Sequence, residues 1–299
     1  VDRGREAAVA AGLAEVMTFS FVEPEADALC ATLPLCPGEP VHLENPLAQT
    51  QGTMRRSLLP GLLSAARDNL NCGERSVAIF EEGRVFAADP DGPLEAERLA
   101  LALAGGGIYR GVDSRVDFPQ LKGVVTAVLE RAAFPPVVWR RGGAPWLDDS
   151  EGAVLETTAG TAVGIAGMLA EELSSRWELK TGVYVAEIDL EAALEHLPVP
   201  AFQALPRFPA VVTDMTVEHP QEIAYSDLET MVRELAGSRV EKVELRARFT
   251  GKGLPQGAVR TTLRLVYRHP ERSLTQDEVN AEHEDLRQRL AERLGVRFA

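Results

Sequence analysis

The sequence predicts an α+β protein of two domains. The chain has 299 residues, which is more than one average domain contains. Four prolines fall within residues 198–209, and proline disfavours helix at its own position and at the residue before it. Upstream of this segment, helical patterns flank strands of a largely antiparallel sheet; downstream, the elements follow the order β-α-β-β-α-β. We therefore place the domains at residues 1–204 and 205–299.

The first domain is predicted to carry helices on an antiparallel sheet. Alternating apolar residues indicate strands over 15–22, 76–87, 98–106 and 182–190, and a hairpin over 153–169. Helical patterns cover residues 5–13, 56–70 and 118–134. The second of these helices has Pro60 near its first turn, where proline is tolerated.

The second domain has the order of elements of the ferredoxin-like fold. Its predicted strands are 211–217, 239–249, 258–268 and a short closing strand, 296–298. Ser226 and Glu229 have the spacing of a capping box at the start of one helix, and Thr275 and Glu278 have it at the start of the other. The sequence therefore predicts two helices on one side of a four-stranded sheet.

Charge is unevenly distributed along the chain. The formal net charge is −14, which argues against nucleic-acid binding by the whole surface. Residues 239–272 nevertheless hold nine basic and three acidic residues. The field of this segment can attract a polyanion. A solvated strand face would have the same composition, so both interpretations stay open.

The glycine-rich stretch FTGKGLPQGAVRTTLRL, residues 249–265, invites comparison with a phosphate-binding loop. Such a loop needs the pattern GxxxxGK[ST] between a strand and a helix. This stretch lies between two predicted strands, so we predict a hairpin turn. The sequence also lacks GxSxG and HExxH, and its three cysteines form no CxxC pair. We therefore predict no catalytic residues and no metal site, with incidental thiols in a reducing compartment.

Aromatic and basic side chains of the second domain suit RNA binding instead. One face of a ferredoxin-like sheet is free of helices, and such faces bind single-stranded RNA by stacking bases on aromatic rings, while arginine and lysine contact phosphates. Phe249 ends one predicted strand, and Arg260, Arg264 and Arg268 share one face of the next. A position of Phe249 in the core is the alternative.

Several stretches, taken in order, resemble the beta subunit of bacterial phenylalanyl-tRNA synthetase. In the first domain they are EVMTFSFV, ENPLAQTQGTMRRSLLPGLLSAARDNL, AIFEEGRVF, DFPQLKGVVTAVL, VGIAGML and VYVAEIDL. In the second domain the resemblance runs from RFPAVVTDMTV through RSLTQDEV. It covers essentially the whole chain, and the ordered set is more specific than any single motif.

The resemblance implies a class II synthetase-like, non-catalytic fold for residues 1–204 and a ferredoxin-fold anticodon-binding domain for residues 205–299. It implies a cytoplasmic (αβ)₂ aminoacyl-tRNA synthetase whose alpha subunit activates phenylalanine with ATP and magnesium, and it allows a magnesium ion near the subunit interface. The partners would be the alpha subunit and tRNA(Phe), without a membrane. Because the chain starts at Val1 and the family's upstream modules are absent, we expect a C-terminal fragment that does not hydrolyse mischarged tRNA.

The resemblance also implies two sets of site residues. The helix 57–70 matches the family's interface helix, with a plain core helix as the alternative. The residues expected at the subunit interface are Arg55, Arg56, Leu58, Leu59, Leu62, Leu63 and Ala66. Phe249 matches an aromatic position that stacks on an anticodon base, and Arg260 a position near the anticodon. The residues expected to contact RNA are Phe249, Arg246, Arg248, Lys252, Arg260, Arg264 and Arg268.

The sequence departs from the family pattern in the second domain. Val212 and Thr213 stand where the family usually has arginine, and Ala247 replaces an acidic residue. Two other functions are therefore kept. One is a stand-alone class II synthetase-like ligase for small molecules, in which Arg84 and Glu81 would have to act together around ATP. The other is a structural assembly module without RNA contact.

Overall fold

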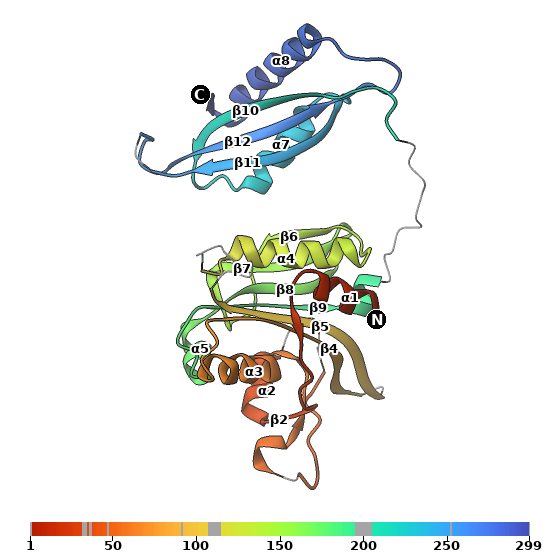
Figure 1. Cartoon of the computed structure of the whole chain (residues 1–299), viewed down its shortest axis with the longest axis vertical. Helices are drawn as coiled ribbons and strands as arrows, with labels where there is room; N and C mark the ends of the chain where they lie inside the picture. Colours follow the sequence, from red (N-terminus) through yellow and green to blue (C-terminus); the bar gives the residue numbers. More distant parts are fainter. Residues whose placement is uncertain are drawn as a thin grey trace. The chain divides into compact units, whose positions relative to one another are not determined.

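Two units, Val1–Pro200 and Ala201–Ala299, make up the chain in the computed structural model (Figure 1). The structure describes residues 2–31, 35, 38–46, 48–90, 92–106, 115–194, 205–251 and 253–298. The predicted boundary near residue 204 and the predicted RNA contact Lys252 lie outside these residues. No described helix is long and apolar enough to cross a membrane.

The first unit is built on a seven-stranded sheet with the order β1-β4-β5-β9-β8-β7-β6. Neighbouring strands are antiparallel, apart from β1 and β4, which pair in parallel. The strands are β1 (Ala14–Glu15), β4 (Ser76–Asp89), β5 (Gly92–Gly105), β6 (Val137–Arg141), β7 (Leu147–Thr157), β8 (Ala162–Leu169) and β9 (Val183–Asp189). The mixed α and β content and the largely antiparallel sheet confirm the predicted α+β class.

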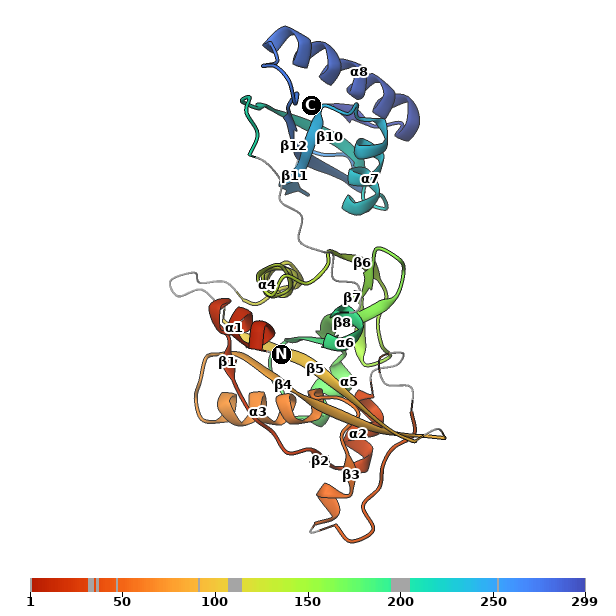
Figure 2. The ribbon, with the colours of Figure 1, turned by 90° about the vertical axis from the view of Figure 1, so that its right-hand side faces the viewer.

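Helices cover both faces of this sheet (Figure 2). One face carries α2 (Pro24–Cys30), α3 (Leu59–Asn71) and α5 (Glu171–Arg176), and the other carries α1 (Asp2–Ala10), α4 (Phe118–Arg131) and α6 (Leu190–Leu194). The alternation of β4 serves both faces, because Ile79 packs in the core beneath α3 while Phe80 packs beneath α4. The sheet is thus buried on both sides.

The predicted strand 15–22 is a strand only at its two ends. After β1, the amide and hydroxyl of Thr18 donate to the carboxylate of Glu81 rather than to a backbone carbonyl. Strand pairing resumes in β2 (Phe21–Val22), which joins β3 (Thr53–Met54), preceded by the 3₁₀ turn Gln49–Gln51. Between the two strands the side chains of Met17 and Phe19 point into solvent.

The second unit has a four-stranded antiparallel sheet with the order β11-β12-β10-β13, as the ferredoxin-like prediction requires. Both described helices lie on one face of this sheet (Figure 2). The elements in order are β10 (Val211–Pro220), α7 (Tyr225–Leu235), β11 (Val240–Phe249), β12 (Ala258–Tyr267), α8 (Gln276–Leu294) and β13 (Arg297–Phe298). The second face of the sheet is therefore free to carry a binding site.

One of the two predicted capping boxes is present. Thr275 accepts from the backbone of Glu278, and the Glu278 side chain accepts from the backbone of Thr275 at the start of α8. The prediction for Ser226 was wrong, because α7 already begins at Tyr225 and Ser226 lies inside its first turn. A hydroxyl inside the helix cannot take the N-cap position.

Candidate functional site

The MRRSLL and FEEG motifs meet in a buried polar network of the first unit. Arg55 Nη1 donates to Glu81 Oε1 at 2.7 Å and to Thr18 Oγ1 at 3.0 Å. The side chains of Arg55 and Glu81 are only 5% and 3% exposed. The guanidinium of Arg55 also lies against Gly83, where an added Cβ would come within 2.7 Å of Nη2. Gly83 of the FEEG motif is therefore needed, because any larger residue there would clash with Arg55 of the MRRSLL motif.

The VYVAEIDL segment joins this network at the start of α3. Glu187 of β9 is buried and accepts hydrogen bonds from Ser57 Oγ at 2.7 Å and from the Leu58 amide at 2.9 Å. A carboxylate in this place stabilises amide groups that have no partner inside the helix. Three segments that are far apart in the sequence are thus joined by their motif residues.

Arg56 is likewise bound inside the chain. Its Nε donates to Asp27 Oδ2 at 2.8 Å, and its backbone amide donates to Asp27 Oδ1 at 2.7 Å. Asp27 is fully buried in α2. Arg55 and Arg56, both expected at a subunit interface, therefore bind carboxylates of their own unit.

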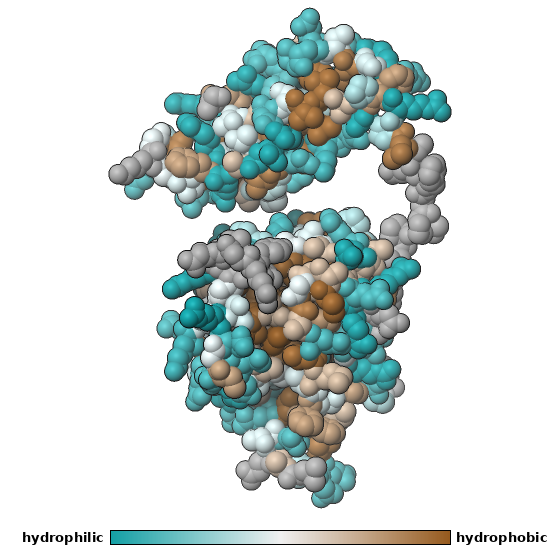
Figure 3. Space-filling model, viewed as in Figure 1, coloured by the Kyte–Doolittle hydropathy of each residue, from teal (hydrophilic) through white to brown (hydrophobic). Residues whose placement is uncertain are grey.

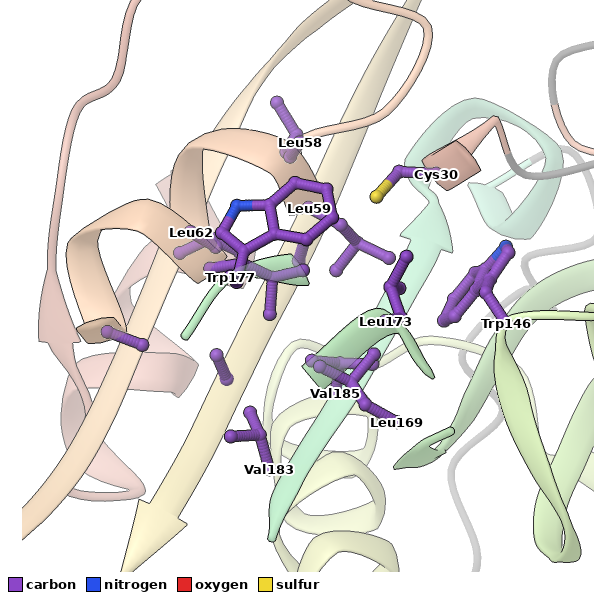
Figure 4. Close-up of a cluster of buried hydrophobic side chains, with 14 of the residues drawn as sticks. Cys30, Leu58, Leu59, Leu62, Trp146, Leu169, Leu173, Trp177, Val183 and Val185 are labelled. Atoms are coloured by element: carbon purple, nitrogen blue, oxygen red, sulfur yellow. The ribbon is translucent and has the colours of Figure 1, made fainter. Parts of the chain in front are cut away.

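The apolar residues expected at the subunit interface lie in the core of the first unit. Each is 0% exposed: Leu58, Leu59, Leu62, Leu63 and Ala66. Figure 4 shows Leu58, Leu59 and Leu62 gathered around Trp177. These five side chains match the alternative of a core helix, because the sheet and α5 cover this side of α3. Contact between α3 and another subunit stays a prediction.

An exposed apolar surface does exist beside the outward side of α3. The exposed fractions of Met17, Phe19 and Phe21 are 88%, 75% and 41%. We call the following group the Phe19 surface, which lines a hollow of about 590 Å³: Met17, Phe19, Phe21, Gly61, Ser64 and Ala65. Figure 3 shows further hydrophobic surface where β1 and β4 lie on the first unit. Large exposed apolar patches are typical of interaction sites.

The helix-free face of the second sheet presents ion pairs rather than a bare basic row. Even-numbered residues of β12 point to this face, because the odd-numbered ones are buried beneath the helices. Arg264 donates to Asp214 of β10 through Nε at 2.8 Å and Nη2 at 2.9 Å. Arg260 pairs with Glu218 at 2.6 Å. The hydrogen bonds from Arg264 hold the pKa of Asp214 below its ordinary value.

Arg268 continues this arrangement at the end of β12. Its Nε lies 2.7 Å from Glu241 of β11, and it also donates to the carbonyl of Phe208. All three arginines that were expected to bind phosphate therefore have a carboxylate partner in this unit. Arg260 differs from the other two, because its buried Nε has no hydrogen-bond partner among the described residues.

Phe249 lies at the end of β11 and is 48% exposed. It is paired in register with Arg260, so both side chains belong to the helix-free face. Its ring lies over the hairpin, since a Cβ added at Gly251 would be 3.4 Å from Cζ. Placement of Phe249 in the core, the alternative from the sequence, is wrong, whereas stacking on a base stays a prediction.

Arg246 and Arg248 are exposed on the edge strand β11 and make no ion pair with a described residue. Arg246 lies in an irregularity of the strand between Leu245 and Ala247. Its charge is close enough to the helix-free face to contribute to the lowered pKa of Asp214. The register pairs Arg248 with Thr261, whose side chain is buried on the helix side. The two guanidinium groups therefore belong to opposite sides of the sheet edge.

Two family matches cover almost the whole chain. Residues 1–190 match the family described as "Phenylalanyl tRNA synthetase beta chain CLM domain". The chain belongs to the phenylalanyl-tRNA synthetase beta chain family. Residues 206–298 match "Ferredoxin-fold anticodon binding domain". This confirms the resemblance drawn from the motifs.

Curated relatives carry the name phenylalanine–tRNA ligase beta subunit. The protein of Moorella thermoacetica is 38% identical in an alignment 306 positions long, gaps included, which covers 99% of this chain and 37% of the relative. The protein of Thermotoga maritima is 31% identical over 290 residues, covering 96% of this chain and 36% of the relative. The chain thus spans little more than a third of the length of these relatives.

A solved structure shows the same fold at low sequence identity. The crystal structure of pyrrolysyl-tRNA synthetase from Desulfitobacterium hafniense matches with a TM-score of 0.50 and 18% identity, covering 64% of this chain and 66% of that one. This likeness concerns the fold alone. It agrees with the synthetase-like fold that was predicted for residues 1–204.

In this member of the beta chain family, Arg84 and Glu81 do not form an ATP site. Glu81 is buried in the network with Arg55, whereas Arg84 lies on the other face of β4 and pairs with Glu95 at 3.1 Å and Glu97 at 2.7 Å. Residues three apart on a strand point to opposite faces. Nor do the described residues contain a group of three or more His, Cys, Asp or Glu that could hold a metal ion.

The sequence reasoning missed the acidic halves of these networks. In the first unit they are Asp27 and Glu187, and in the second they are Asp214, Glu218 and Glu241. Asp214 and Glu218 could have been found, because the ferredoxin-like strand order places β10 beside β12. Asp27 and Glu187 carry no such signal, since no repeat or spacing connects them with residues 55–58.

Proposed function

We propose that this chain is the C-terminal part of a phenylalanine–tRNA ligase beta subunit and that its second unit binds the anticodon region of tRNA(Phe) during aminoacylation. The observation that carries the proposal is Phe249, half-exposed on the helix-free face of a unit that matches an anticodon-binding family. The whole enzyme would be a cytoplasmic (αβ)₂ assembly.

The residues of this chain do not fit the chemical step of that enzyme. Arg84 is bound to two glutamates on the surface, and Glu81 is closed off by Arg55. We therefore assign ATP, magnesium and phenylalanine activation to the alpha subunit. This chain contributes binding surfaces. The alternative of a stand-alone small-molecule ligase is not supported, because Arg84 and Glu81, the two residues that it required to act together, are on opposite faces of β4.

Phe249 suits a stacking role because its ring is already placed. The ring is supported by the hairpin at Gly251 and shares its face with Arg260. A base stacked on an aromatic side chain contributes about 1–3 kcal/mol to binding.

Titration of the whole chain with labelled tRNA(Phe), at fixed salt concentration, tests this proposal. Phe249→Ala should weaken binding by about 1–3 kcal/mol. Phe249→Leu should weaken it similarly, because leucine keeps apolar bulk but has no aromatic face. Phe19→Ala removes an exposed phenylalanine from the other unit and should leave the affinity unchanged. If wild type and Phe249→Ala bind equally, Phe249 does not stack on a base, and if neither binds, the chain is the structural module without RNA contact.

We further propose that the alpha subunit docks on the Phe19 surface. The curated relatives are named beta subunits, and Met17, Phe19 and Phe21 expose three large apolar side chains on one hollow, whose rim also carries charged residues such as Arg67 and Asp68. With this docking site α3 still lies at the interface, as the resemblance implied. The contact would be made by the outward side of the helix, with Gly61, Ser64 and Ala65, and not by its buried leucines.

Co-purification with the alpha subunit tests the docking proposal. Phe19→Glu should abolish co-purification while the tryptophan fluorescence of the first unit stays native. Val138→Glu places the same charge on another exposed apolar residue, of β6, and should still co-purify. Retention of the alpha subunit by Phe19→Glu would exclude this surface.

A further inference from the structure

We infer that this chain holds the phosphates of a bound RNA strand with Arg246 and Arg248 at the edge of β11, and not with the paired arginines on the sheet face. The inference rests on the proposed function, because it takes RNA as the ligand. It assigns the RNA backbone to the sheet edge and leaves the helix-free face to the bases. Of the residues expected to contact RNA, Arg246 and Arg248 would then bind phosphates, whereas the three arginines of the sheet face would not.

The arginines on the helix-free face of the sheet are neutralised by neighbouring carboxylates. Arg260, Arg264 and Arg268 each have a carboxylate within 2.8 Å. A phosphate that approaches one of these guanidinium groups also approaches that carboxylate, and repulsion from one offsets attraction to the other. Between Asp214 and Glu218, the hydroxyls of Thr216 and Thr262 add a neutral hydrogen bond of 3.0 Å. Together these groups form a surface of donors and acceptors with little net charge.

The two arginines at the edge of β11 have exposed guanidinium groups that can bind a phosphate. Arg246 and Arg248 are exposed, and neither has an ion pair with a described residue. A free guanidinium can bind a phosphate through two parallel hydrogen bonds. No ion pair with a carboxylate of the described residues has to be broken at either side chain, and the carboxylates of Asp214 and Glu244 act on Arg246 only through their charge.

Both edge arginines lie close to Phe249, the residue proposed to stack on a base. Strand residues rise about 3.3 Å each, so Arg248 and Arg246 lie roughly 3 and 10 Å from Phe249 along β11. Because β11 is an edge strand, its free side has no neighbouring strand in this sheet. The backbone that flanks a base on Phe249 can therefore run along this open edge, which Arg246 borders near the helix-free face and Arg248 on the helix side. The ligand class is the sugar–phosphate backbone of a single-stranded RNA loop.

The salt dependence of binding separates the two groups of arginines. Each phosphate bound on a single strand adds about 0.7 to the slope of log affinity against log salt concentration. With the whole chain and labelled tRNA(Phe), the double variant Arg246→Gln, Arg248→Gln should therefore flatten the slope by about 0.7 for each phosphate that it no longer binds. The matched variant Asp214→Asn, Arg264→Gln removes one acid and one base from the face and should leave the slope unchanged, even where affinity falls.

Each outcome of this experiment decides the inference. A flatter slope only in the Arg246, Arg248 variant supports it. A flatter slope in the Asp214, Arg264 variant places phosphates on the sheet face and overturns it, whatever the edge variant does, and an unchanged slope in the edge variant overturns it as well. These results still leave RNA binding intact, so they separate this inference from the proposed function. Failure of the wild-type chain to bind tRNA(Phe) would overturn both.

Discussion

Arginine–carboxylate pairs occur in both units, but their surroundings differ. The side chains of Arg55 and Glu81 in the first unit are 5% and 3% exposed, whereas those of Arg260 and Glu218 in the second are 39% and 22% exposed. A buried pair cannot lose one partner without leaving an uncompensated charge in the interior, while an exposed pair is solvated in either state. The same two residue types therefore maintain the fold in one unit and can serve a ligand in the other.

The largest effect should come from breaking the buried pair. Glu81→Ala leaves Arg55 without its carboxylate and should cost about 3–5 kcal/mol of unfolding free energy. Urea unfolding followed by tryptophan fluorescence measures this directly, because Trp139, Trp146 and Trp177, the three tryptophans of the chain, all lie in the first unit.

A double variant serves as the control for this measurement. Replacing both partners, with Arg55→Met and Glu81→Leu, removes the charges together and should recover part of the loss. If Glu81→Ala unfolds at the same urea concentration as the wild type, the pair has no structural role and the contrast between the two units is lost.

A smaller effect on stability should come from lowering the pH. It tests whether a buried group that becomes charged also destabilises the second unit. Half-buried His283 lies 3.1 Å from the hydroxyl of Tyr267, and burial lowers its pKa, assisted by Arg287. Because the unfolded chain keeps the ordinary value of about 6.5, it binds the proton first as pH falls. The second unit should therefore lose stability as pH falls below about 6.5.

Hydrogen exchange of the β12 amides, corrected for the intrinsic effect of pH, measures this loss in the second unit alone. Protection should fall between pH 7.5 and pH 5.5 in the wild type. His283→Gln cannot take up the proton and should lose less protection over the same interval. Equal losses in both proteins would assign the pH effect to another group.

The smallest effect is expected for the exposed pair. Glu218→Gln should cost only about 0.2–1 kcal/mol, because water solvates Arg260 when its partner is gone. Hydrogen exchange of the second unit is again the measurement. A loss comparable with that of Glu81→Ala would mean that the sheet face is a structural network like the one in the first unit.

Much of the fold could be predicted from the sequence because it is encoded locally. The alternation of residues 258–268 and the capping box at Thr275 both reappear in the structure. The segment 15–22 also alternates, yet Thr18 bonds a side chain of another strand and the segment leaves the sheet. Periodicity describes which face a residue would take, but it does not decide whether a partner strand is present.

The candidate sites were harder to predict because they depend on contacts between distant segments. The leucines of α3 and the phenylalanines nearby are equally apolar in sequence, yet Leu62 is buried and Phe19 is exposed. Arg264 and Arg246 are likewise equivalent as residue types, but only Arg264 forms an ion pair with a described acid. Exposure and neutralisation are properties of the assembled sheet, so local charge counts could not separate these residues.

The ion pairs between β10 and β12 also bear on how this sheet forms. A slip of one residue would turn buried side chains outward, but a slip of two would keep every side chain on its face. The pattern of apolar residues therefore cannot exclude a slip of two residues in the pairing of β10 with β12. In either direction such a slip would place Arg264 opposite Thr216 or Val212 and separate it from Asp214. Opposite charges on neighbouring strands thus select one alignment of two strands that are separated in the sequence by 37 residues, 221–257.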